Sequence, residues 1–136
     1  MEIKKIKDHP NLLDQTLFLI EDSFGYEKEN SFYNDFYPLM NEKNHEHLYV
    51  VTDKDRVIAH IGALTKKIQI KNNIYSFTMF GGIAVSKDYR GKGLFKKLFN
   101  QVLNEYKANQ AFYLLWSDKL ELYQQFGFYP CGELKS

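Results

Sequence analysis

The sequence predicts a mixed α/β (α+β) domain around one central sheet. Apolar residues recur at helical spacing near the N-terminus, change to a strand pattern after residue 47, and return to helical spacing after residue 90. Helices and strands in this order are typical of mixed α/β folds with one shared core. The length of 136 residues is that of a single domain, and no repeat or linker divides the chain, so residues 1–136 are expected to fold as one domain.

The N-terminal part predicts a short strand, a helix and a second, shorter helix. Ile3 and Ile6 belong to the strand, and Asp8 is expected to cap a helix whose first turn holds Pro10. Gly25 is a natural end for that helix. Its apolar side chains recur at helical spacing, at Leu12, Leu13, Leu17, Ile20 and Phe24. The second helix is expected to begin with Asn30 or Ser31 as its cap, with Pro38 disturbing its end.

The centre of the chain predicts three antiparallel strands. Residues 48–51 are a buried-strand run, and residues 53–55 form a polar turn. Residues 57–70 and 74–85 are expected to be two long strands joined by a hairpin turn at 71–73.

The C-terminal third predicts a helix, a strand, a short helix and a further strand. Residues 90–109 carry an apolar stripe along one helical face, and residues 111–116 are an apolar strand of the kind buried on both faces. The short helix covers residues 120–126 and ends at Gly127, and the further strand covers residues 128–131.

Composition excludes several functional classes. The net charge of +1 argues against a nucleic-acid-binding protein, which would carry a strong basic excess. Residues 1–7 lack the apolar core of a signal peptide, and no run approaches the length of a membrane span. The only cysteine, Cys131, excludes an internal disulfide and fits a reducing compartment. We therefore expect a cytoplasmic protein with no nucleic-acid or membrane partner.

The most informative segment joins the strand that ends at Val85 to the helix expected near Arg90. The first turn of a helix leaves N–H groups unpaired and carries partial positive charge, so it binds phosphate. Gly91 and Gly93 would let a pyrophosphate approach the backbone closely, and Arg90 and Lys92 add positive charge. A plain tight connection explains the pattern as well. The spacing fits neither a Walker loop nor G-x-G-x-x-G, which disfavours those two nucleotide folds.

The run from Val85 to Leu94 resembles the signature of the GNAT N-acetyltransferase superfamily, Arg/Gln-x-x-Gly-x-Gly/Ala. Arg90 and Gly93 match its first two fixed positions, while Phe95 stands where Gly or Ala is usual. Residues 122–128, Leu-Tyr-Gln-Gln-Phe-Gly-Phe, resemble the Leu-Tyr-x-x-x-Gly-Phe that ends the family's last helix. The order of elements also matches the family's from its first strand to its sixth, so the resemblance covers nearly the whole chain.

The resemblance implies a GNAT-like mixed central sheet with antiparallel N-terminal strands, a splayed strand pair and about four flanking helices. Relatives finish with a seventh strand, which is not recognisable here. Either the protein is longer than this chain, or a second copy or an additional C-terminal domain covers the open sheet edge.

The resemblance further implies an N-acetyltransferase in which a primary amine of a small molecule, peptide or protein attacks the thioester of acetyl-CoA directly. The pantetheine arm would bind the backbone of Ile83, Ala84 and Val85, and one N–H there would polarise the thioester carbonyl. The cofactor-binding segment would continue through Arg90, Gly91, Lys92, Gly93, Leu94 and Phe95. Tyr123 matches the residue that protonates the departing thiolate, and a phenol with a pKa of about 10 suits that role. The alternative for Tyr123 is a space-filling residue on an amphipathic helix.

Other functional features leave alternatives open. No acid lies in residues 76–82, where many relatives carry a base, so His60, Asp118, a water chain or no dedicated base are the alternatives. His60 is expected to be a packed histidine, and His45-Glu46-His47 a polar loop without a metal. A group of aromatic residues could line an acceptor site or simply pack in the core: Tyr26, Phe32, Tyr33, Phe36 and Tyr37. Two alternatives to an enzyme are a non-catalytic CoA-binding or regulatory module and a purely structural domain.

Overall fold

The computed structural model describes residues 1–106 and 112–115. Its strands and longer helices are, in chain order, β1 (Glu2–Lys5), α1 (Leu13–Phe24), α2 (Phe32–Asp35), α3 (Tyr37–Met40), β2 (Leu48–Asp53), β3 (Arg56–Ile70), β4 (Asn73–Val85), α4 (Leu94–Tyr106) and β5 (Phe112–Leu115). Short 3₁₀ turns are η1 (Ile6–Asp8), η2 (Pro10–Leu12), η3 (Glu42–His47) and η4 (Lys87–Tyr89). The predicted helix over 120–126 and strand over 128–131 lie outside the described residues.

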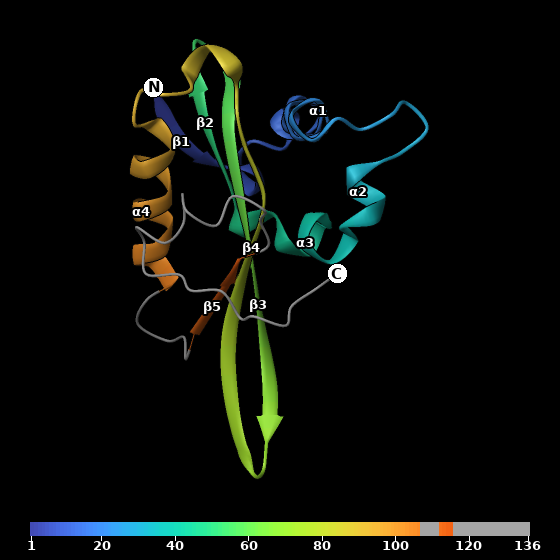
Figure 1. The fold of residues 1–136 in the computed structure, drawn as a ribbon, viewed down its shortest axis with the longest axis vertical. Helices are drawn as coiled ribbons and strands as arrows, with labels where there is room; N and C mark the ends of the chain where they lie inside the picture. Colours follow the sequence, from blue (N-terminus) through green and yellow to red (C-terminus); the bar gives the residue numbers. More distant parts are fainter. Residues whose placement is uncertain (107–111, 116–136) are drawn as a thin grey trace.

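The sheet has the strand order β1-β2-β3-β4-β5. The first four strands pair antiparallel, and β5 runs parallel to β4, so the sheet is mixed. The helix α4 covers one face, and α1, α2 and α3 lie on the other side (Figure 1). This arrangement confirms the predicted fold class.

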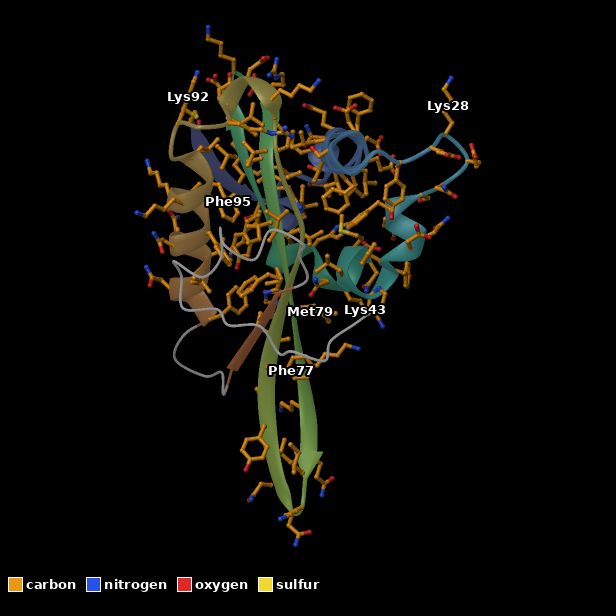
Figure 2. All side chains as sticks on the ribbon, in the orientation of Figure 1. Lys28, Lys43, Phe77, Met79, Lys92 and Phe95 are labelled. Carbon is orange, nitrogen blue, oxygen red and sulfur yellow. The ribbon has the colours of Figure 1, made fainter. Side chains whose placement is uncertain are left out.

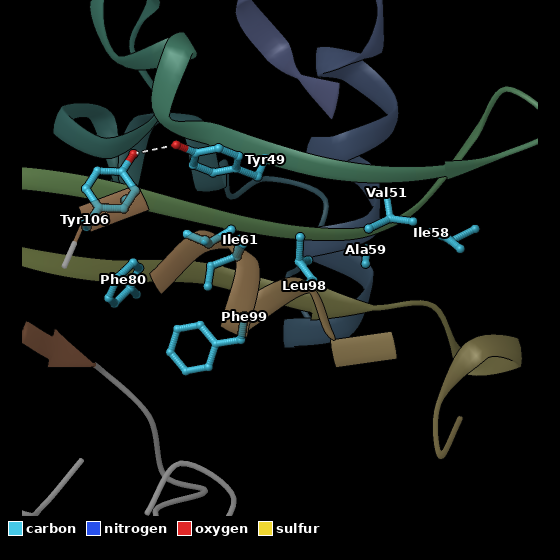
Figure 3. Close-up of a cluster of buried hydrophobic side chains, with 11 residues drawn as sticks. Tyr49, Val51, Ile58, Ala59, Ile61, Phe80, Leu98, Phe99 and Tyr106 are labelled. Carbon is cyan, nitrogen blue, oxygen red and sulfur yellow. Dashed lines mark hydrogen bonds between the residues drawn. The ribbon is translucent and has the colours of Figure 1, made fainter. Parts of the chain in front are cut away.

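Each face of the sheet has its own hydrophobic core. Beneath α4, the Phe80 ring from β4 meets the Phe99 ring edge to face at 5.4 Å between centroids, and both side chains are fully buried (Figure 3). At the end of that helix, the Tyr106 hydroxyl lies 2.8 Å from the Tyr49 hydroxyl of β2. The opposite core lies beneath α1 and α3 and includes Ile20. Packing on both faces fixes β4 between two helical layers.

The two predicted hairpins form with tight turns. Lys54 and Asp55 both have positive φ between β2 and β3, which is the geometry that matches strand twist in a two-residue turn. The β3–β4 turn is also tight, because Ile70 pairs with Asn73 and Lys71 has φ 52°. The end of this hairpin extends well beyond the helices (Figure 1).

The N-terminal prediction was wrong in two details. Asp8 does not cap α1, which begins at Leu13 with Leu12 at the N-cap position and no side-chain cap. Pro10 starts the 3₁₀ turn η2 instead, because the φ that its ring fixes suits a 3₁₀ turn as well as an α-helix. Ile6 likewise leaves the predicted strand and is buried in η1.

The predicted ends of α1 and α2 are confirmed. Gly25 closes α1 in the left-handed conformation with φ 71°. Ser31 caps α2, its hydroxyl accepting a hydrogen bond from the Asn34 N–H at 3.2 Å. Pro38 lies in the first turn of the separate helix α3 and thereby ends α2 before it.

Candidate functional site

The junction between β4 and α4 is a loop and not the start of a helix. After the turn η4, Gly91 and Gly93 both have φ 76°, a left-handed conformation that no α-helix contains. The predicted helix start near Arg90 is therefore wrong, and α4 begins at Leu94. A Cβ atom added at either glycine would meet no atom of the described residues within 4 Å, so this part of the chain leaves the backbone there uncovered.

This loop is anchored on the β2–β3 turn. The Tyr89 hydroxyl donates a hydrogen bond of 2.5 Å to Asp53 Oδ2, and this bond raises the pKa of Tyr89. The guanidinium of Arg56 lies over the Tyr89 ring at 5.7 Å and 3.8 Å from Asp88 Oδ2. The sequence alone does not indicate this contact, because Tyr89 and Asp53 lie 36 positions apart.

Arg90 stabilises the loop through a hydrogen bond to the backbone. Its Nε–H donates to the Val85 carbonyl oxygen at 2.9 Å, which ties the loop to the end of β4. The Lys92 ammonium lies 5.7 Å from the Tyr89 ring centroid. Figure 2 shows Lys92 at the N-terminal end of α4. Basic side chains outnumber acidic ones from the turn to the second turn of α4: Lys87, Arg90, Lys92, Lys96 and Lys97 against Asp88.

Phe95 lies on the inner side of α4. It packs against the core beneath this helix, with its ring 5.3 Å from the Phe99 ring, and Figure 2 shows it between α4 and the sheet. Its side chain therefore does not extend over the glycine loop. The first-turn N–H groups of α4, which helix geometry leaves without an intrahelical acceptor, face the loop together with the helix dipole.

The other predicted cofactor residues lie on the last part of β4. Ala84 is buried toward α1, while Ile83 and Val85 pack partly against the α4 side. Beside them, β5 pairs with β4 over Phe77–Phe80 only, among the described residues. The outer edge of β4 from Gly81 to Val85 therefore leads directly into the glycine loop. Tyr123, the predicted acid, lies outside the described residues.

His60 is a packed histidine, as predicted. Its side chain is fully buried on β3, and its Nδ1 lies 2.6 Å from the Gly82 carbonyl oxygen. Burial lowers the pKa of His60 to about 4, a shift that the hydrogen bond to Gly82 partly offsets. So weak a base in an apolar layer is poorly suited to accept a proton from an amine, which argues against His60 as the general base.

The aromatic group of the α1–α3 layer divides into core and surface. Phe32 is fully buried, stacks on Phe36 at 4.5 Å and meets Phe24 edge to face at 5.6 Å. Phe36 and Tyr37 are 41% and 54% exposed, so the group serves the core and also presents aromatic surface. Core packing is therefore confirmed for Phe32, whereas an acceptor-site role for the exposed Phe36 and Tyr37 stays a prediction.

Two other features concern metals and membranes. The His45-Glu46-His47 segment forms the 3₁₀ turn η3, where the His45 Nε2 lies 3.0 Å from the Met40 carbonyl oxygen. Within residues 1–106 and 112–115, no three metal-ligating side chains gather in one place. In the same part of the chain, no helix has the length and apolar character to cross a bilayer.

Solved structures with the same fold include acetyltransferases and a transcriptional regulator. A transcriptional regulator from Bacillus halodurans C-125 aligns with a TM-score of 0.76 at 18% identity, covering 99% of this chain and 97% of the other. A predicted acetyltransferase with acetyl-CoA from Clostridium acetobutylicum gives 0.73 at 17% identity, covering 99% and 92%. An aminoglycoside 6′-N-acetyltransferase from Acinetobacter haemolyticus gives 0.72 at 16% identity, covering 100% and 96%. No curated protein matches the sequence.

This chain thus shares its fold with these solved structures. The family model of the acetyltransferase (GNAT) domain matches residues 2–131. This chain belongs to the GNAT acetyltransferase family, and its general chemistry is acyl transfer, for which the family's acyl donor is acetyl-CoA.

Proposed function

We propose that the protein is an N-acetyltransferase that moves the acetyl group of acetyl-CoA to a primary amine, by direct attack in a ternary complex. The observation that carries this proposal is the loop at Arg90–Leu94, which combines two left-handed glycines, a helix N-terminus and surplus positive charge. The family match supplies the reaction class. The amine acceptor is a small molecule, a peptide or a protein.

In this proposal the loop holds the pyrophosphate of CoA. The N–H groups at the start of α4 donate to the phosphate oxygens, and Gly91 and Gly93 allow the backbone to approach them. Arg90 also ties the loop to Val85 through its Nε–H, and the charges of Arg90 and Lys92 both attract the phosphates. The pantetheine arm then runs along the outer edge of β4 at Ile83–Val85, where its amides bond to the strand as another strand would.

Substituting one loop glycine tests the cofactor site. Gly93→Ala should weaken CoA binding about tenfold, because the free loop would relax away from the left-handed backbone and binding would have to restore it at a cost of about 1–2 kcal/mol. Calorimetric titration with CoA and acetyl-CoA measures the change. Gly25→Ala is the matched control: it has φ 71° and equally open space, so it carries the same backbone strain far from the loop. Equal affinity in wild type and Gly93→Ala would contradict a role for this loop.

Tyr123 is proposed to protonate the departing CoA thiolate. If so, Tyr123→Phe should lower turnover about 10²–10⁴-fold with little change in CoA affinity, because general acid catalysis acts on the reaction and not on cofactor binding. The measurement is release of CoA thiol with a panel of amines, including a polyamine, an aminoglycoside and a lysine peptide. Tyr75→Phe, on the partly exposed end of the β3–β4 hairpin, is the control for loss of a tyrosine hydroxyl. Full activity in Tyr123→Phe would remove this residue from the mechanism.

The same assays separate an enzyme from a binding module. CoA binding without thiol release across the whole amine panel would favour a CoA-binding module without turnover. A ligand that binds the folded state must raise the unfolding temperature by mass action. If millimolar acetyl-CoA gives neither such a shift nor a calorimetric signal, the proposed function is overturned altogether.

A further inference from the structure

The strand β4 contains a β-bulge just before the proposed pantetheine segment. His60 of β3 pairs with Ala84, but Gly62, two residues further on, pairs with Gly81. Gly82 and Ile83 therefore both lie opposite the single residue Ile61. A bulge of this kind leaves one residue outside the regular ladder and redirects its backbone groups.

His60 holds the backbone of this bulge. The ring Nδ1 lies 2.6 Å from the Gly82 carbonyl oxygen. A carbonyl oxygen can only accept, so Nδ1 carries the proton and donates it. Gly82 has φ 63°, and a Cβ there would lie 3.0 Å from the His60 ring and 3.5 Å from Ile20, so ring and bulge pack in direct contact.

Burial of the His60 imidazole in this apolar layer opposes folding. Its Nε2 is buried and has no hydrogen-bond partner among the described residues, and no charged group contributes to its pKa shift. A buried polar atom without a partner opposes folding. Among the described residues, the hydrogen bond to the Gly82 carbonyl is thus the favourable polar contact of the buried imidazole.

One peptide unit links this bond to the proposed reaction. The Gly82 carbonyl and the Ile83 N–H belong to the same peptide, and no peptide bond in the described residues is cis. In a trans peptide these two groups point in opposite directions. Because His60 holds the carbonyl on the β3 side, the Ile83 N–H points away from β3, toward the outer edge of β4. Among the described residues, β5 accompanies this edge only as far as Phe80.

We propose that His60 is a positioning residue that fixes the Gly82–Ile83 peptide so that the Ile83 N–H is aimed at the thioester carbonyl oxygen of acetyl-CoA. This inference rests on the proposed function, since it concerns how the bound thioester is polarised. A donor that is already oriented needs no reorganisation as negative charge develops on the oxygen. His60 itself touches neither the cofactor nor the reacting atoms.

Two substitutions of matched shape test the proposal. His60→Asn places an amide N–H near the position of Nδ1 and keeps the bond to Gly82, whereas His60→Leu has the same branching without a donor. The probes are acetyl-CoA and S-ethyl-CoA, a thioether that lacks the carbonyl oxygen. Wild type and His60→Asn should prefer acetyl-CoA by about three- to tenfold, as one hydrogen bond provides, and His60→Leu should lose the preference. Affinity for S-ethyl-CoA should stay within about twofold in all three, since the pyrophosphate loop is unchanged.

An infrared measurement adds a direct signature. The carbonyl stretch of ¹³C-labelled acetyl-CoA should move to lower frequency on binding to wild type and His60→Asn, and less so on binding to His60→Leu. An unchanged preference and an unchanged stretch in folded His60→Leu would overturn the positioning role. Failure of all three proteins to bind either ligand would instead overturn the proposed function, so the two failures are distinguishable.

A measurement on the wild-type protein covers the case in which His60→Leu does not fold. Nitrogen NMR of ¹⁵N-histidine-labelled protein should show His60 as the Nδ1–H tautomer, with that proton protected from exchange by the bond to Gly82. Observation of the Nε2–H tautomer would overturn the proposal, because Nδ1 could then not donate to the Gly82 carbonyl.

Discussion

Lowering the pH from 7 to 4 should reduce the free energy of unfolding by about 3 kcal/mol through His60 alone. Burial lowers the pKa of this imidazole from 6.5 to about 4. Between these two values the unfolded chain binds a proton that the folded protein excludes, so stability falls as the pH falls. Above pH 6.5 the residue is neutral in both states, and below pH 4 it is protonated in both, so the loss is confined to this window.

Urea unfolding at a series of pH values measures the effect, with His60→Asn as the control. The variant keeps the other titrating groups, so the difference between the two stability curves isolates His60. That difference should change by about 3 kcal/mol across the window and be flat above pH 7. Parallel curves for the two proteins would contradict both the burial and the lowered pKa of His60.

Gly82→Ala should destabilise the fold by about 3–4 kcal/mol, the sum of a backbone and a packing cost. The positive φ of Gly82 costs an alanine about 1–2 kcal/mol. The new methyl group would also press on the His60 ring at 3.0 Å, and this ring is fully buried and cannot swing into solvent.

The matched control for Gly82→Ala is Gly25→Ala at the end of α1. Gly25 has a similar φ of 71°, but a Cβ there meets nothing within 4 Å, so only the backbone cost of about 1–2 kcal/mol remains. Thermal or urea unfolding of the two variants measures the difference between them, which is the packing contribution. Equal destabilisation would mean that the bulge relaxes freely away from His60.

Most of the described fold could be predicted from local patterns. The hairpin at residues 70–73 and the strands beside it follow from period-two alternation and turn residues, and the left-handed end of α1 at Gly25 follows from glycine chemistry. The predicted Asp8 cap was wrong because Pro10, two residues later, is compatible with the start of an α-helix and with a 3₁₀ turn. The 3₁₀ turn forms here, next to the buried Ile6.

The candidate site was predicted in outline but not in geometry. The glycines and basic residues of the loop were recognisable, yet the predicted helix start near Arg90 is four residues too early, although Arg90 and Lys92 are good helix formers. The two glycines with φ 76° interrupt that tendency. The bulge at Gly82 had one signal in the sequence, the Gly81-Gly82 pair in a strand, which was available but not sufficient to place it.

The sequence by itself determined which segments become helices and strands and which family they resemble, because periodicity, turn residues and short motifs are properties of neighbouring positions. Only the tertiary structure determined which side chains hold the backbone of the candidate site in place. The Tyr89–Asp53 bond joins residues 36 positions apart, and the His60–Gly82 bond joins residues 22 apart. Such contacts depend on how one hairpin packs against the next element. A single bulge shifts the strand register and so changes which residues can meet.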